Sequence, residues 1–308
     1  MFGASVQSRT IIVSALGGLA SPLLAMGASV ALERVVGVTT DLRLMELGHP
    51  NEPVLRRLLA EAPGSYQSSV MVGNLAEPAA EAIGANALLV RTAAMYHDIG
   101  KVRRPYFFVE NQLGRDNPHS RLSPHLSALV IIAHVKDGLE LAEEYNLPPA
   151  IRSAIQEHHG TTLAKYFYQR ACELAGNPEE VYEAGFRYPG PKPQSRETAL
   201  LMLADTIEAA ARALEAHSPL EVNNLVHQLI EEKISDGQLD ESPLTFRDLA
   251  VVKRVFISTL NSMFHQRIKY PDQMEKEAHR AAEEGDRRAG REDAVAQSAE
   301  PEGGPDAG

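Results

Sequence analysis

Apolar residues along most of this chain recur every three or four positions, which is the spacing of one face of an α-helix. The pattern predicts helices over residues 53–62, 66–83, 87–97, 126–145, 149–159, 161–174 and 197–215, with two or three more between 219 and 270. No stretch shows the strict alternation of apolar and polar residues that is typical of a half-buried strand. The sequence therefore predicts an all-α protein.

Three regions of the chain differ in composition. Residues 1–40 contain a long uncharged run, residues 41–270 carry the helical pattern, and residues 271–308 are charged and poor in apolar side chains. The last region cannot bury enough apolar surface to fold alone, so we predict a disordered tail. Within the middle region, residues 103–124 are predicted to form a loop that is too long to be a passive connector.

The uncharged run Ile11–Leu32 would be about 33 Å long as a helix, which is enough to cross a bilayer. Its glycines, serines and Pro22 favour a helix that packs against other membrane helices. Because Arg34 and Arg43 follow the run while only Arg9 precedes it, the large domain would lie on the cytoplasmic side of the cell membrane. The alternatives are a signal peptide and a buried helix of a cytoplasmic protein.

Charge and cysteine content exclude several classes of function. The 308-residue chain has a formal net charge of -11, whereas general nucleic-acid binders usually carry a basic excess that neutralises phosphates. Any nucleotide ligand must therefore be held by a local site. The single cysteine, Cys172, excludes an internal disulfide and a thiolate metal cluster and fits a reducing compartment.

The candidate chemistry centres on His97 and Asp98, which end an apolar helix and precede Gly100 and Lys101. Neighbouring helical residues point about 100° apart, so both can reach one metal only near a helix end. Gly100 is predicted to supply the turn there. Imidazole and carboxylate together suit zinc, manganese or iron, and Lys101 would face an anion. An isolated His-Asp pair is, however, far more often an ordinary polar helix end with a capping role, so the interpretation depends on the rest of the chain.

Further ligand types stand at helix ends or on apolar helix faces, namely His134, His158, His159 and Asp205. Asp205 lies in the apolar middle of its predicted helix, where an unpaired carboxylate would be costly. Together with His97 and Asp98, the set resembles the HD-domain metal-dependent phosphohydrolases, in which a helical bundle collects histidines and aspartates around one or two metals. The resemblance implies an HD-domain helical bundle over residues 41–270.

A closer resemblance is carried by the segments AAMYHDIGKVRRPYFFVENQ, IQEHHGTTLAKYFY and FRYPGPKPQSRETALLMLADTIEAA. These are similar to the cytosolic domain of the seven-transmembrane HD proteins of the PgpH type, which hydrolyse cyclic di-AMP to pApA. Ile11–Leu32 would then correspond to the last membrane helix of that family. The chain would be a naturally shortened relative or one started at an internal methionine.

This resemblance also implies roles for individual residues. His97, Asp98 and Asp205 would bind one divalent metal, Mn²⁺ or Fe²⁺, and His134, His158 and His159 a second, with Asp98 bridging. The family has one more histidine ligand, and here Ser68 stands at its position. Serine is a poor ligand, so water is expected to fill the gap and the first metal site to be weak.

Catalysis in such a site is metal-assisted hydrolysis, with Asp98 orienting the metals and Lys101 neutralising a phosphate oxygen. The substrate-binding candidates are Lys101, Arg103, Arg104, Tyr106 and Phe107, with Phe108 beside them; packing of a lid is the alternative role for the aromatic residues. A catalytically degenerate cyclic-dinucleotide receptor is the second hypothesis. An HD-GYP phosphodiesterase is disfavoured because no Gly-Tyr-Pro follows the histidine doublet, and a triphosphohydrolase or a homodimer stays open.

Overall fold

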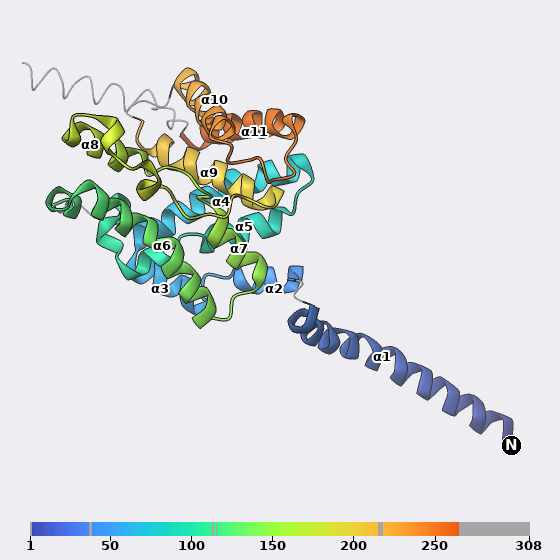
Figure 1. The fold of residues 1–308 in the computed structure, drawn as a ribbon. Coiled ribbons are helices and arrows are strands. Elements are labelled where there is room, and N and C mark those ends of the chain that lie inside the picture. The colour runs from blue at the N-terminus through green and yellow to red at the C-terminus, as the bar shows by residue number, and fades with distance from the viewer. Residues whose placement is uncertain (1, 37–38, 113, 115, 215–217, 265–308) are drawn as a thin grey trace, which may run out of the picture. The chain divides into compact units, whose positions relative to one another are not determined.

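The computed structural model describes residues 2–36, 39–112, 114, 116–214 and 218–264 (Figure 1). Within these residues the structure is helical, and its one β feature is an isolated antiparallel bridge between Leu163 and Arg187. The prediction of an all-α fold is therefore confirmed for the described part of the chain. The predicted tail at 271–308 lies outside it, as does the end of the predicted domain beyond residue 264.

The described α-helices follow one another with short connections. Their bounds are α1 (Phe2–Val36), α2 (Asp41–Leu47), α3 (Pro53–Glu61), α4 (Pro63–Ile83), α5 (Ala87–Tyr96), α6 (Pro124–Glu144), α7 (Pro149–Glu157), α8 (Lys165–Ala175), α9 (Arg196–Arg212), α10 (Pro219–Ser235) and α11 (Phe246–Phe264). Proline at the first position opens several of them, because its fixed φ suits a helix start and its missing N–H has no partner there. For this reason α4 begins at Pro63, earlier than predicted.

The predicted loop between 103 and 124 contains short turns of 3₁₀-helix. These are η2 (Pro105–Phe107), η3 (Val109–Asn111) and η4 (Pro118–Arg121), and η1 (Ile99–Arg103) precedes them. Two further turns, η5 (Pro178–Glu180) and η6 (Glu183–Phe186), follow α8. Residues 161–164 are not helical, contrary to prediction, because Ala164 and Tyr188 each donate a backbone hydrogen bond across to the opposing segment.

The core is built where α4 packs against α5 and α9, while α5 also contacts α7 and η1 packs on α6. Small and aliphatic residues make these contacts close, and Leu75 on α4, Tyr96 on α5 and Leu200 on α9 are fully buried. Burying each such side chain contributes roughly 1.5–3 kcal/mol. The core therefore fixes α5, α6, α7 and α9, the four helices that carry the predicted ligands.

The N-terminal run forms one helix, α1, as expected for an uncharged apolar segment. Among the described residues, however, no helix has both the length and the apolar character needed to cross a membrane. The predicted transmembrane segment at Ile11–Leu32 is therefore not borne out. Glycines, serines and Pro22 interrupt the run and dilute its apolar character.

Candidate metal centre

His97 and Asp98 stand at the end of α5, where the chain passes from α-helix into η1. His97 still donates its backbone N–H to Ala93, 2.9 Å away, so its side chain is aimed by the helix. Gly100 serves a different purpose from the turn predicted for it, since its φ is not positive. A Cβ at residue 100 would lie 1.9 Å from the carbonyl oxygen of His134, so glycine is required for the close approach of η1 to α6.

Three histidine rings are oriented in the same way by their own helices. In each ring Nδ1 lies within hydrogen-bonding distance of the carbonyl oxygen three residues earlier, 2.8 Å for His97, 2.6 Å for His134 and 2.8 Å for His158. When such a ring is neutral, donation from Nδ1 leaves the Nε2 lone pair available, which is the form of histidine that binds metals.

Asp98 lies at the centre of this arrangement. Its Oδ1 is 3.2 Å from Nε2 of His134 and 3.7 Å from Nε2 of His158, while its Oδ2 is 3.2 Å from Nε2 of His97. The carboxylate therefore faces histidines on both sides. Asp98, His97 and His158 are buried to at least 99%, so these polar atoms are shielded from bulk water.

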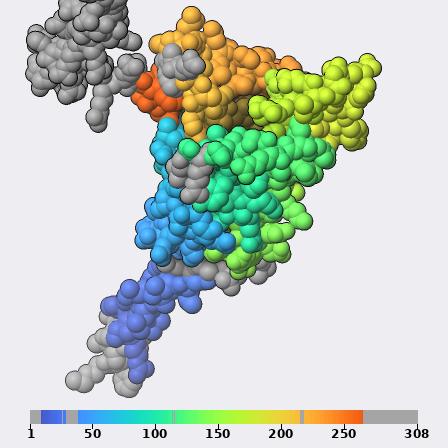
Figure 2. Space-filling view, turned by 90° about the vertical axis from the view of Figure 1, so that its left-hand side faces the viewer, coloured from blue at the N-terminus to red at the C-terminus, as the bar shows by residue number. Residues whose placement is uncertain are grey.

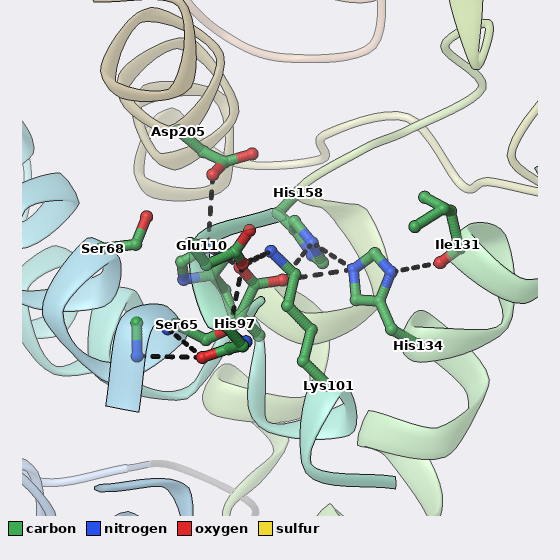
Figure 3. A network of polar contacts seen from close by, with 12 residues as sticks. Ser65, Ser68, His97, Lys101, Glu110, Ile131, His134, His158 and Asp205 are labelled. Carbon is green, nitrogen blue, oxygen red and sulfur yellow. Dashed lines mark hydrogen bonds and ion pairs between the residues drawn. The ribbon is translucent and has the colours of Figure 1, made fainter. Parts of the chain in front are cut away.

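Asp205 approaches the same place from α9, on the side of His97 (Figure 3). Its Oδ1 is 3.4 Å from Nε2 of His97, and its Oδ2 is 3.9 Å from Nδ1 of His159. These residues form two groups of donor atoms, and within each group the atoms lie within 4.8 Å of one another. The first group consists of His97, Asp98 and Asp205, and the second of Asp98, His134, His158 and His159. Asp98 belongs to both.

The chemistry of these residues fits divalent cations. Among the described residues, Nε2 of His97 and Oδ1 of Asp98 are buried and make no hydrogen bond. Leaving a buried polar atom without a partner costs about 1–3 kcal/mol, which a bound cation would offset. Imidazole nitrogens with carboxylate oxygens suit manganese, iron or zinc. The site thus supports metal binding, and the identity of the metal stays a prediction.

Proton binding differs between the two groups when no metal is present. Burial lowers the pKa of His97, but the negative charges of Asp98 and Asp205 outweigh it and raise the pKa to about 10. Burial and the positive charges of His97 and His134 lower the pKa of His158 to about 3. Burial likewise lowers the pKa of His159 well below its ordinary value. The first group therefore holds a proton that a metal must displace.

Lys101 lies beside the centre, with its Nζ 2.7 Å from Oδ2 of Asp98. The same ammonium donates a hydrogen bond to Oε1 of Glu110 at 2.9 Å and lies 4.9 Å from the centre of the Phe108 ring. Lys101 and His97 hold the pKa of Asp98 well below its ordinary value against the effect of burial. Glu110 was not anticipated from the sequence, because a glutamate in a predicted loop has no pattern that marks it as buried.

The other predicted substrate-binding residues contact parts of the protein outside the two donor groups. Arg104 pairs with Asp137 on α6, and Nη2 of Arg103 lies 3.9 Å from Glu144. The ring centre of Phe107 is 5.4 Å from that of His119, and Tyr106 is about half exposed. Phe108 does contact a donor residue, with its ring centre 5.7 Å from that of His134, and outside the loop the ring centre of Tyr188 lies 4.3 Å from that of His159.

Ser68 is buried on α4 and is held by two residues of α9. Its hydroxyl donates to Oε2 of Glu208 at 2.9 Å and accepts a hydrogen bond from Nη2 of Arg212 at 2.7 Å. Arg212 also pairs with Glu208, which closes the triangle. Glu208 follows Asp205 by three residues, a spacing that places both carboxylates on one face of the helix and could have identified it from sequence.

A cavity of about 760 Å³ lies between the segment after α7 and helix α10, and is lined among others by Thr162, Arg187, Thr206 and Lys233. In Figure 2 the yellow-green surface around α8 adjoins the orange surface of α10 and α11. Thr206 directly follows Asp205 in the chain, and the charge of Lys233 acts on both Asp205 and His159. None of the donor residues lines the cavity itself.

Fold and site together define an all-helical domain with a buried histidine and aspartate centre suited to divalent metals. The HD domain family matches residues 66–210. The solved HD domain of the phosphodiesterase PgpH from Listeria monocytogenes, in complex with cyclic-di-AMP, is similar to this chain at 44% sequence identity and a TM-score of 0.67. The match covers 71% of this chain and 100% of the solved domain. The chain belongs to the HD-domain family, and its domain is related to the PgpH HD domain.

Full-length relatives extend beyond this chain. Over 266 residues the chain is 44% identical to the cyclic-di-AMP phosphodiesterase PgpH of Bacillus subtilis, covering 86% of the chain and 37% of the relative. It is 45% identical over 257 residues to the protein of the same name from Listeria monocytogenes, with 83% and 35% covered. The chain thus spans about a third of the length of these curated relatives.

Metal content is expected to reflect the unequal donor groups. The second group offers four donor residues, whereas the first offers three and retains the proton of His97. After exposure to a chelator, purified protein should keep about one metal per chain, while an excess of Mn²⁺ should restore about two. Elemental analysis across a chelator series tests this, and two metals lost at the same chelator concentration would contradict it.

Proposed function

We propose that this protein is a metal-dependent phosphodiesterase that hydrolyses cyclic di-AMP to pApA. The observation that carries the proposal is the position of Asp98, whose two oxygens face separate histidine groups in one buried centre. The relatives named as cyclic-di-AMP phosphodiesterases, and the solved HD domain bound to that nucleotide, support the choice of substrate.

In this proposal His97, Asp98 and Asp205 hold one divalent cation, and His134, His158 and His159 hold a second together with Asp98. Such cations, when bound, supply Lewis-acid activation of the phosphodiester and of water near neutral pH. The protein supplies the orientation. Hydrogen bonds from Nδ1 fix the rings of His97, His134 and His158, so the donor atoms need not reorganise during the reaction.

Lys101 is proposed to act as a fixed positive charge at the edge of the centre. Its ammonium contacts Asp98 and Glu110, and this pairing holds it within reach of a phosphate placed beside Asp98. The cavity of about 760 Å³ that Thr206 and Lys233 help to line falls within the size range of small-molecule sites and would accept a nucleoside part of the substrate. We keep as predicted substrate contacts the residues Arg103, Arg104, Tyr106 and Phe107. To contact the substrate, their side chains would leave their present partners in the protein.

The test is a turnover assay with two substrates. The full chain is incubated with Mn²⁺ and either cyclic di-AMP or a linear RNA oligonucleotide, and products are identified by mass spectrometry. RNA is the informative competitor, because ribonuclease Y of Helicobacter pylori is 30% identical over 138 residues. We expect pApA from the cyclic substrate and little RNA cleavage, since the chain carries a net charge of -11. Cleavage of RNA alone would overturn the proposed substrate.

Ser68 favours one second candidate, a receptor that binds the cyclic dinucleotide without hydrolysing it. A serine at this position leaves the first donor group with three residues. Measuring binding and turnover in the same Mn²⁺-containing buffer separates the two functions, because a receptor would show saturable binding of cyclic di-AMP and no pApA.

A further inference from the structure

The first donor group is incomplete, and a carboxylate stands one helical turn from one of its members. His97, Asp98 and Asp205 provide three donor residues, while Nε2 of His97 points into the group without a hydrogen-bond partner among the described residues. Tetrahedral and octahedral metal sites need four to six donors, some of which water can provide. A further protein ligand would have to come from a residue adjoining this group.

Glu208 is that neighbour. It lies three residues after Asp205 on α9, and the residue is 8% exposed. Pairs of ligands three residues apart on one helix are a recurrent device in helical dimetal sites, since both side chains project from the same face. Asp205 and Glu208 therefore share one face of α9, and the charge of Asp205 acts on Glu208.

The hydrogen bonds of Glu208 leave half of its carboxylate uncommitted. Oε2 accepts from both Ser68 and Arg212, whereas no hydrogen bond within the described residues involves Oε1. The short serine side chain is what admits the carboxylate here, because an imidazole at position 68 would extend further into the space beside Glu208. Ser68 and Arg212 then hold Glu208 in place by hydrogen bonds, in the way that residues behind a metal ligand commonly orient a ligating carboxylate.

We propose that Glu208 is a ligand of the first metal in this protein, binding through Oε1 and taking the position that Ser68 cannot fill. This inference rests on the proposed metal centre but not on the proposed substrate. In place of the water expected at this position, Glu208 supplies a negatively charged ligand, which raises the metal affinity of the first donor group.

The experiment measures Mn²⁺ binding to the full chain without nucleotide, by titration and by elemental analysis after gel filtration. Glu208→Gln keeps the shape of the side chain and its bonding to Ser68 while removing the charge. We expect it to weaken the weaker Mn²⁺ site at least about tenfold and to leave the tighter site within about twofold, as loss of one ligand should. Glu197→Gln on the same helix is the matched control and should bind as the wild type does.

A second pair of variants distinguishes ligation from a role in folding. In Ser68→His protein the imidazole should take over the position, so adding Glu208→Gln should change Mn²⁺ binding less than about twofold, a non-additive result. Ser68→Ala should retain the weaker site, because the serine is not a ligand. Unchanged Mn²⁺ binding in Glu208→Gln, or equal losses in the wild-type and Ser68→His backgrounds, would overturn the proposal. Neither outcome depends on which phosphodiester is hydrolysed.

Discussion

Asp98→Asn is expected to remove both metals and to lower hydrolysis of cyclic di-AMP at least about a thousandfold, on the scale of losing one fixed charge that stabilises a transition state. The reason is that one carboxylate serves both donor groups, with Oδ1 facing His134 and Oδ2 facing His97 at 3.2 Å each. An amide keeps the shape but offers a neutral oxygen and an N–H group that repels a cation.

The control for this variant is Asp116→Asn, since Asp116 is an exposed aspartate whose recorded partner is Arg121 at 3.7 Å. It should retain both metals and full activity. Metal content is measured by elemental analysis and activity by product formation, each at saturating Mn²⁺. An Asp98→Asn protein that keeps one tightly bound metal would show that the second group does not need the shared carboxylate.

The second large expected effect is a difference between the two metals in how many protons are released when each one binds. Without metal the pKa of His97 is raised to about 10 by Asp98 and Asp205 against burial, so near neutral pH a metal must displace its proton. Apparent Mn²⁺ affinity of the first group should therefore rise about tenfold for each pH unit between about 6 and 8. In the second group the pKa of His158 is lowered to about 3, so that ring is already neutral.

Titration calorimetry in buffers of different ionisation enthalpy measures this directly. The tighter Mn²⁺ should bind with little proton release from His158 or His159, and the weaker one with release of about one proton. His97→Ala should abolish the pH-dependent step while the tighter site survives. Equal proton release for both metals would mean that His97 is not the protonated member of the centre.

The positions of the ligand candidates could be predicted because each stands at a place where the local pattern is informative. His97 and His158 stand where their helices end, His134 interrupts an apolar helix face, and Asp205 lies in an apolar run. Polar residues at such positions must find partners inside the protein. The structure brings all of them together, as expected from the family resemblance.

Other features depend on which helices pack side by side. Gly100 is required by the carbonyl of His134 on α6, a contact that no local pattern contains. Glu110 was predicted to lie in a loop, yet it accepts hydrogen bonds from Lys101 and from Ser65 on α4. His134 and Ser65 are remote in sequence from the residues that they contact, so these contacts follow only from tertiary packing.

By itself the sequence determined the helical class, the approximate helix bounds and the residues able to bind metal, because periodicity, capping and burial of polar side chains are local properties. Tertiary structure alone decided that the hydroxyl of Ser68 meets Glu208 and Arg212. Those contacts join residues up to 144 positions apart. Their geometry is set by how α4, α5 and α9 pack, which no short segment of the chain encodes.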